Sequence, residues 1–582
     1  MEQNIFLSQV KQYIDCMNKD NIKRCLLDVA KQIPKESTQA FLQCLQNYSS
    51  DKEEKSDEDI YKSRMSDQLV EEKRNEILIW MDSIDNHELY LDADGYEDYS
   101  GGYWNSDWTW DYSDPMGIGT KIEMAVAFVK DCVNDRKYEV ALNILDRILD
   151  LEVSVETDGD EMSLDIEQLQ EESIIKIDLK QLALIVLYVD YQVRDKKERA
   201  ADIYTYFGYS FFRNIHMEEI RHIGREELKD EAVFWEDWIE ILSSKMGDLE
   251  ARLLKEAVIY SKGADGLAEI ARKNYMKHPS LYLEALNEYE MNHEYQKMVD
   301  IGTEAVSIID KKYRIRGKIA LKASCAEFYL GHEDKMKELW YEVYVSDMNE
   351  VNFLRLFLED NMAQSYGMKG KDLPKIPKKE NGNGNCNLEL VENLVDSTTA
   401  TYLAFFSGEF QKVKKACVNP TESLGWSGRF IGYGIKIFLL YLYNEECLGK
   451  ATKNIAHEIA RSFGFKENEE FYYLKINPSE KNGGDSETFW MAFCKWKNYF
   501  TITSSEKNKY LHWLEEIIDK RTNAIVGGQF RNHYAGVALL ISALGEVKES
   551  MGYQGARQEI KAKYKKMFPR HSSFNAAVNE YI

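Results

Sequence analysis

The clearest structural signal in the chain is the segment IEMAVAFVKDCVNDRKYEVALNILDRILDL, residues 122–151. It contains two amphipathic stretches that are separated by a short polar turn. In the second stretch the apolar residues recur every three or four positions, so that Tyr138, Ala141 and Leu145 share one helical face. The small side chain of Ala141 allows two helices to approach closely. We therefore expect one helix that ends near Asn134 and a second that begins near Tyr138.

Similar helix pairs recur along the chain. Residues 267–310 and 317–359 each contain two amphipathic stretches that meet at a polar turn, MNHEY or LGHED. A further pair and a shorter helix are expected between residues 510 and 568. The 582 residues include only 8 prolines and 33 glycines, which fits a helical chain because helix interiors tolerate neither residue well. The predicted fold class is all-α, a degenerate tetratricopeptide-like α-solenoid of helical hairpin repeats, without strands.

The chain is too long for one compact core, so we expect several parts. The segment at residues 371–387 is rich in Pro, Lys, Gly and Asn and is predicted to be a linker. The predicted parts are an N-terminal helical segment (1–50), an acidic linker with a helix and a Trp/Asp-rich loop (51–118), a first repeat block (119–370), the linker (371–387) and a second repeat block (388–582).

The net charge of −25 is unevenly distributed. Residues 51–115 contain 20 acidic and 6 basic side chains, and residues 152–178 contain 10 acidic and 1 basic. This overall field argues against a protein that binds the phosphate backbone of nucleic acids. Clusters of acidic side chains usually form a solvated surface. The more specific alternatives are that they bind a basic protein partner or mimic DNA.

The nine cysteines are scattered without a CxxC motif, which favours the reducing cytoplasm. The N-terminal sequence lacks the basic and apolar regions of a signal peptide. The longest apolar runs, residues 182–189 and 435–443, are too short to span a bilayer and are predicted to be buried helix. We therefore expect a cytoplasmic protein without a membrane segment.

Tryptophan and aspartate are concentrated in YWNSDWTWDYSDP, residues 103–115, within a long predicted loop. In an extended chain, alternating rings point the same way. Rings beside carboxylates can bind a cation, such as a modified lysine, or hold a partner. Alternatively, the rings cover the apolar end of the repeat stack. The candidate partner-binding residues are Trp104, Trp108, Trp110, Tyr112, Asp107 and Asp111.

The C-terminal region is basic, and its last helix could contact nucleic acid through Arg557, Lys561, Lys565 and Arg570. With Lys563 and Lys566 included, the cations of this helix surround it more than they form one stripe. Only Tyr564 and Phe568 accompany them as aromatic side chains. A solvated terminal face is the simpler interpretation.

No catalytic template is complete. HEIAR at residues 457–461 has Arg461 where a zinc protease needs its second histidine. Gly449 and Lys450 lack the first glycine of a phosphate-binding loop. DADGYED at residues 92–98 places Gly95 at position 4, whereas a calcium-binding EF-hand needs glycine at position 6. We expect no metal, no cofactor and no catalytic residues, and a cryptic enzyme is the least favoured alternative.

Several phrases resemble the helical-repeat portion of bacterial proteins that carry a SWIM-type zinc finger. They are YEVALNILDRILD (138–150), the A…LG…W…Y hairpin (326–344), LGWSGR (424–429), RNHYAGVALLISALGEV (531–547) and FPRHSSF (568–574). The resemblance covers residues 120–582. The SWIM pattern CxCx(n)CxH is absent, so no metal ligands carry over. What the resemblance implies is a stand-alone helical scaffold. Because the concave surface of a solenoid is its usual binding face, we expect a non-catalytic adaptor that binds a protein partner and can regulate a separate enzyme.

Overall fold

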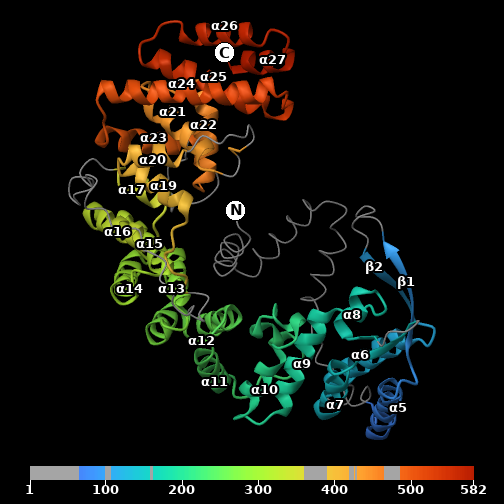
Figure 1. The fold of residues 1–582 in the computed structure, drawn as a ribbon. Helices are drawn as coiled ribbons and strands as arrows, with labels where there is room; N and C mark the ends of the chain where they lie inside the picture. Colours follow the sequence, from blue (N-terminus) through green and yellow to red (C-terminus); the bar gives the residue numbers. More distant parts are fainter. Residues whose placement is uncertain are drawn as a thin grey trace, which may run out of the picture. The chain divides into compact units, whose positions relative to one another are not determined.

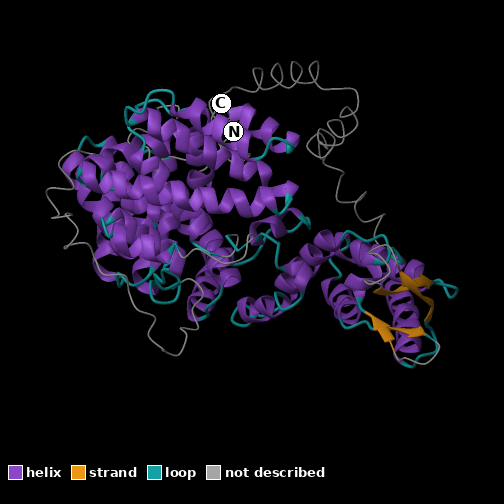
Figure 2. Ribbon diagram, turned by 45° about the horizontal axis from the view of Figure 1, so that its top comes forward, coloured by secondary structure: helices purple, strands orange, loops and turns teal. Residues whose placement is uncertain are grey.

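The computed structural model describes residues 65–98, 107–157, 162–358, 390–417, 425–426, 429–464 and 485–581. The chain divides into two compact units, Met1–Asp178 (unit 1) and Leu179–Ile582 (unit 2). Both are mainly α-helical where they are described, as Figures 1 and 2 show. The solenoid arrangement and the predicted domain boundaries stay predictions, and the segments 1–50 and 371–387 lie outside the described residues.

The helices of unit 1 confirm the predicted pair. They are α5 (Asp67–Asp85), α6 (Ile118–Asn134), α7 (Tyr138–Leu149) and the short α8 (Ile166–Glu171). The turn between α6 and α7 contains Arg136 with a left-handed φ of 64°. Helix α7 buries Ala141 and Leu145 completely. On its other side Arg147 forms ion pairs of 2.9 and 2.7 Å with Asp82 and Asp85 of α5.

Unit 1 also contains a four-stranded sheet, so the prediction of a chain without strands was wrong. The strands are β1 (Leu91–Asp98), β2 (Asp107–Ser113), β3 (Val153–Glu156) and β4 (Met162–Leu164), in the order β2-β1-β3-β4. Figure 2 shows them in orange. Strand β2 alternates aromatic and polar residues, which is the period of a strand. The predicted Trp/Asp-rich loop is therefore largely a β-hairpin.

The first helices of unit 2 contain the expected hairpins. Pairs α13–α14 and α15–α16 meet at turns where His293 and Gly331 have left-handed φ values of 58° and 77°. Helices α14 and α15 pack closely because Gly302 lacks a side chain: a Cβ there would lie 2.7 Å from the Cβ of Ala323. The helices are α9 (Leu179–Val193), α10 (Arg199–Tyr206), α11 (Glu231–Ser244), α12 (Asp248–Asn274), α13 (Ser280–Met291), α14 (Tyr295–Ile308), α15 (Arg314–Tyr329), α16 (Glu333–Ser346) and α17 (Glu350–Arg355), with 3-10 turns η2 (Ser210–Phe212) and η3 (Met217–His222).

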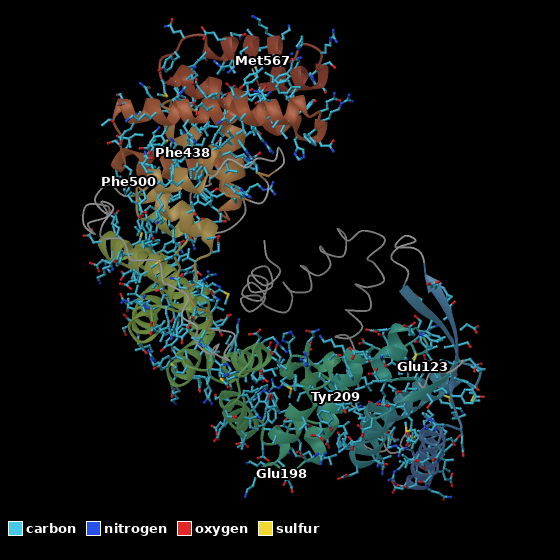
Figure 3. All side chains as sticks on the ribbon, viewed as in Figure 1. Glu123, Glu198, Tyr209, Phe438, Phe500 and Met567 are labelled. Atoms are coloured by element: carbon cyan, nitrogen blue, oxygen red, sulfur yellow. The ribbon has the colours of Figure 1, made fainter. Side chains whose placement is uncertain are left out.

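The C-terminal helices of unit 2 enclose a core rich in aromatic rings, which Figure 3 locates through Phe438 and Phe500. Trp496 is fully buried, and its indole N–H donates to the carbonyl of Phe406 at 2.8 Å. The helices are α19 (Ser397–Phe406), α20 (Phe410–Ala416), α21 (Ile431–Leu442), α22 (Lys450–Ser462), α23 (Asp485–Tyr499), α24 (Ser504–Gly527), α25 (Tyr534–Ser550), α26 (Ala556–Met567) and α27 (Ser572–Tyr581), with the 3-10 turn η4 (Arg531–His533).

The beginning of α22 is held by a carboxylate from a distant helix. Glu546 of α25 is buried and accepts hydrogen bonds from the amides of Ala451 and Thr452, at 2.9 and 2.8 Å, and from the Thr452 hydroxyl at 2.8 Å. This is the segment that carries Gly449 and Lys450. A side chain of the protein itself therefore satisfies two of the N–H groups that a helix leaves open at its start.

The two longest apolar runs lie in α9 and α21 and are buried there, as predicted. Among the described helices, none combines the length and the apolar character needed to cross a bilayer.

Candidate partner-binding site

Strands β1 and β2 form an antiparallel hairpin with two different faces. In its register Gly95 lies opposite Trp110, Ala93 opposite Tyr112, and Asp94 opposite Asp111. Successive side chains of a strand point to opposite sides of the sheet. Trp110 and Tyr112 therefore share one face, the aromatic face, with the small residues Ala93 and Gly95. Asp94 and Asp111 lie on the other, the acidic face.

The aromatic face rests partly on the body of unit 1. Trp110 and Tyr112 are both half-buried. Burial, assisted by the negative charge of Glu172 just after α8, raises the pKa of Tyr112. The cross-strand neighbours of these rings are only a glycine and an alanine. Directly across the strand pair, the two rings therefore face only small side chains.

The acidic face is open to solvent. Asp92, Asp94 and Asp111 are exposed, and Tyr96 is 45 % exposed. Asp94 and Asp111 are directly opposite each other, an arrangement of like charges that weakens a strand pair. The surrounding sequence supplies no compensating cation, because residues 85–120 contain nine acidic side chains and no lysine or arginine.

Strand β1 extends beyond its neighbour β3. The parallel pairing with β3 involves only Leu91 and Asp92 of β1. Leu91 is fully buried and anchors the strand at this point. Residues 93–97 have no strand beside them on that edge in the part of the chain that the structure describes. Figure 1 shows the long β1 arrow beside β2.

The end of β2 is fixed firmly to α6. The carboxylate of Asp114 accepts hydrogen bonds from the amides of Ile118 and Gly119, each at 2.8 Å. Gly119 also lies against the segment after α8, where a Cβ would be only 2.2 Å from the carbonyl oxygen of Ile174. The base of the hairpin is therefore held in a defined position against α6.

The structure brings together part of the predicted site. Trp110, Tyr112 and Asp111 lie in the hairpin, as two rings on one face and a carboxylate on the other. Trp108 and Asp107 belong to β2, opposite Glu97 and Asp98, but their side chains lie outside the description. Trp104 lies outside the described residues altogether.

Sequence reasoning missed the contribution of β1. Its segment DADGYED is expected to be part of a long acidic loop, whereas its backbone is extended in the structure. The local signal for this strand is weak, because aspartate and glycine have low strand propensity. Among the described side chains, no group of three or more His, Cys, Asp or Glu is arranged to hold a metal ion.

The four predicted cations of the C-terminal region have different surroundings. Arg557, at the start of α26, pairs with Glu549 of α25. Lys561 is half-buried, whereas Lys565 and Arg570 are exposed. Figure 3 labels Met567, which ends this helix. One of the four charges is thus balanced within the protein.

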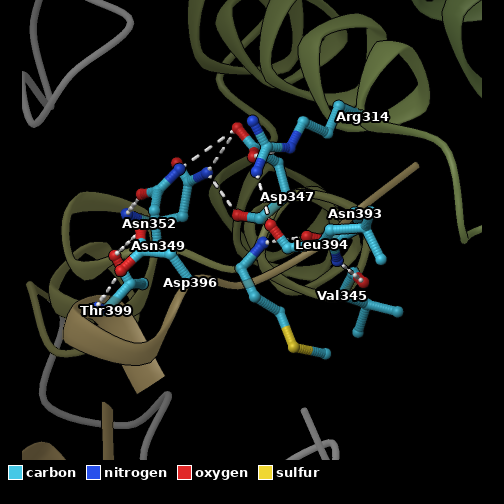
Figure 4. Close-up of polar contacts among 10 residues, drawn as sticks. Arg314, Val345, Asp347, Asn349, Asn352, Asn393, Leu394, Asp396 and Thr399 are labelled. Carbon is cyan, nitrogen blue, oxygen red and sulfur yellow. Dashed lines mark hydrogen bonds and ion pairs between the residues drawn. The ribbon is translucent and has the colours of Figure 1, made fainter. Parts of the chain in front are cut away.

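A cavity of about 450 Å³ lies in unit 2, lined by side chains of α13, α15, the α16–α17 junction and Phe463. Its polar end is a hydrogen-bonded network, shown in Figure 4. The Asp347 carboxylate accepts from the amide groups of Asn349 and Asn352, at 3.1 and 3.3 Å, and lies 3.6 Å from Nε of Arg314. Burial raises the pKa of Asp347.

The same network fastens a connecting segment to the α15–α16 hairpin. The amide of Met348 donates to Oδ1 of Asn393 at 3.0 Å, and Nδ2 of Asn393 donates to the carbonyl of Val345 at 3.1 Å. Arg314 also donates to the carbonyl of Leu394 at 2.9 Å. Since these polar groups bind one another, they hold residues 393–394 in place and do not point to a ligand.

Comparison with known proteins gives no match to a family model, to a curated protein or to a solved structure. The resemblance to the SWIM-type proteins therefore stays a prediction.

Proposed function

We propose that this protein is a non-catalytic binding protein whose β1–β2 hairpin docks a basic segment of another protein. The observation that carries the proposal is the combination of exposed carboxylates with half-buried rings on a hairpin that contains no lysine or arginine. Asp92, Asp94 and Asp111 are exposed on one face, and Trp110 and Tyr112 lie on the other. Carboxylates and aromatic faces both attract lysine and arginine side chains.

The charge distribution supports a protein partner more than a nucleic acid. The acidic hairpin repels phosphates and raises the rate at which a basic protein encounters it. A nucleic-acid contact through the C-terminal cations has less support, because Arg557 is already paired with Glu549. In this proposal the helices of unit 2 serve as a tetratricopeptide-like scaffold in the cytoplasm, which can present a second partner such as an enzyme.

The test compares affinity capture by four full-length proteins from lysate of the native host. They are the wild type, Asp94→Asn/Asp111→Asn, Trp110→Ala/Tyr112→Ala and the control Glu236→Gln/Glu240→Gln. The control removes two exposed carboxylates from α11. We expect a partner that the wild type and the control retain, that both hairpin variants lose, and that salt releases. Cross-linking should place a lysine- or arginine-rich segment of that partner on the hairpin.

Two results would contradict the proposal. One is a partner that the hairpin variants capture as well as the wild type does, with all four proteins equally helical. The other is a cross-linked segment without an excess of basic residues. Competition by added DNA would indicate instead that the hairpin imitates a nucleic acid toward a nucleic-acid-binding protein.

A further inference from the structure

Helix α12 of unit 2 changes direction at a single residue. Gly263 has φ 67° and ψ −167°, and it is the only residue within Asp248–Asn274 whose backbone is not helical. This combination of angles is essentially restricted to glycine. Helix α12 therefore consists of two helical arms, residues 248–262 (arm 1) and residues 264–274 (arm 2), joined by one residue.

Contacts with α13 show that the two arms run in opposite directions. Tyr289 of α13 donates to Asp265, at the beginning of arm 2, at 2.8 Å. Glu284, five residues earlier in α13, forms an ion pair with Lys255 of arm 1. In a straight helix Lys255 would lie about 15 Å from Asp265, and farther still from the level of Glu284. Only a reversal at Gly263 brings both arms beside α13.

The two arms approach each other closely at the reversal. A Cβ on Gly266 would lie only 2.2 Å from the Cβ of Lys262, so the folded-back form requires glycine at this position too. Both arms carry buried apolar side chains, among them Ala257 and Val258 in arm 1 and Ala271 in arm 2. Opening the reversal would separate the arms and expose apolar surface on both.

We propose that this protein forms a dimer with a second copy of itself by exchanging the helices that precede Gly263. If Gly263 takes helical angles, α12 becomes one continuous helix of 27 residues, and its arms no longer contact each other. The surfaces that separate are complementary, so the same contacts can form again between two chains. Residues 179–262 of one copy then pack on arm 2 and α13 of the other.

The sequence and the contacts at the reversal favour this exchange. Residues 256–270 contain no proline, so nothing in them prevents a continuous helix. Short turns under strain are the sites at which proteins exchange elements. The ion pair of Lys255 with Glu284 and the hydrogen bond of 3.4 Å from Asn274 to Ser243 of α11 both cross the break. A second copy of the chain offers each of these contacts unchanged.

The first test compares the oligomeric state of the full-length wild type, Gly263→Ala and Gly266→Ala after refolding from urea at low and high protein concentration. Alanine disfavours the angles of Gly263, and a Cβ at position 266 collides with Lys262. The two variants therefore oppose the folded-back form by different means. Size-exclusion chromatography with light scattering is the readout. We expect roughly tenfold more dimer from each variant than from the wild type.

The matched control is Gly331→Ala. Gly331 also has a left-handed φ, 77°, and an added Cβ there, as at Gly263, meets no atom within 4 Å. Its turn contains His332, whose φ of −95° and ψ of 65° are not helical either, so a change at one residue cannot straighten this turn. We expect Gly331→Ala to form no more dimer than the wild type does.

The second test identifies the surfaces that the dimer uses. Ser243→Cys and Asn274→Cys are introduced into separate chains, which are mixed, refolded and treated with a short bismaleimide. Exchange brings these two positions together from different chains. We expect a covalent dimer from the mixture, in the Gly263→Ala background and in smaller amount in the wild-type background. Each chain alone, and chains without the added cysteines, define the background from native cysteines such as the exposed Cys447.

Three results would overturn the inference. The first is a dimer of either hinge variant whose mixed chains give no cross-link above background, because the copies then associate through another surface. The second is the absence of dimer and of cross-link in the wild type and in both hinge variants, whichever of them fold. The third is an equal gain of dimer in Gly331→Ala. None of these results bears on the docking role of the β1–β2 hairpin, which partner capture tests separately.

Discussion

Two groups of aromatic side chains in this protein have opposite surroundings. In the C-terminal helices of unit 2, Trp496 is fully buried, with ring centroids 4.9 Å from Phe406 and 5.1 Å from Phe493. In the β1–β2 hairpin of unit 1, Trp110 and Tyr112 are only half-buried and lie opposite a glycine and an alanine. The first set of rings fills a core. The second lies on the face of the hairpin opposite the exposed carboxylates, where it adds less to stability and can contact a partner.

The largest contrast should appear when one ring is removed from each region. Trp496→Ala leaves a cavity and removes the hydrogen bond to the Phe406 carbonyl, so we expect the free energy of unfolding of unit 2 to fall by about 3–5 kcal/mol. Trp110→Ala should lower that of unit 1 by less than about 1 kcal/mol. Urea denaturation followed by circular dichroism measures both effects. A loss of similar size in the two variants would mean that the hairpin rings are core residues and would favour their role as a cover of the apolar end.

Two carboxylates that hold helix starts provide the second contrast. Glu546 is buried and accepts three hydrogen bonds at the start of α22, so we expect Glu546→Ala to cost about 3 kcal/mol. Asp114 holds the start of α6 from four residues away, and Asp114→Ala should cost about 1 kcal/mol. Urea midpoints report both values. Equal costs would show that burial of the Glu546 carboxylate adds nothing to its capping role.

A pH dependence should be found in unit 2 because Glu350, in the first turn of α17, is buried. Burial raises its pKa to about 7, and the neighbouring charge of Asp396 acts in the same direction. Since the carboxyl has a lower pKa in the unfolded chain, the folded state binds the proton more tightly. Stability should therefore fall as the pH rises from about 4.5 to 7, by up to about 3 kcal/mol.

The variant Glu350→Gln isolates this effect. It should flatten the pH profile of the urea midpoint between pH 5 and 8 and should be more stable than the wild type at pH 8. The hairpin carboxylates supply the comparison, because Asp94→Asn should leave that profile unchanged in unit 2. An unchanged slope in Glu350→Gln would assign the titration to another group.

The smallest effect concerns the opposed charges of the hairpin. Asp94→Asn removes the repulsion from Asp111 across the strands and should stabilise unit 1 by about 0.5 kcal/mol at low salt. High salt should abolish the gain by screening the charges. Thermal melts at two salt concentrations measure it. If Asp94→Asn is more stable and yet binds the partner more weakly, the carboxylate serves binding at a cost in stability. If the variant is less stable, the carboxylate supports the fold.

The helical part of this fold could be predicted because its signals are local. The polar turn after Asn134 and the apolar period from Tyr138 lie within a few residues of the elements that they define, and α6 and α7 end and begin there. The hairpin was missed for the opposite reason. Strand β1 contains Asp92, Asp94 and Gly95, residues with low strand propensity, and it forms because β2 and β3 pair with it from other parts of the chain.

Only part of the candidate site could be predicted from the sequence. The rings of β2 could be selected because Trp110 and Tyr112 alternate with carboxylates in one short segment. The carboxylates of β1 could not be placed beside them, since that requires the register that sets Asp94 opposite Asp111. The hydrogen bonds from Glu546 to the start of α22 could not be predicted either. Nothing near Thr452 in the sequence indicates a partner 94 residues away.

That separation has a consequence for biosynthesis. At a translation rate of roughly 5–20 residues per second, the ribosome adds Glu546 about 5–20 seconds after Thr452. During this interval the start of α22 lacks its carboxylate, and α25, which contributes much of the surrounding core, has not yet been made. The nascent chain must then carry the rings of α19 and α21 without their final cover. Chaperones that recognise exposed aromatic segments would meet this protein at that stage, and a premature stop before α25 should yield a chain that proteases remove.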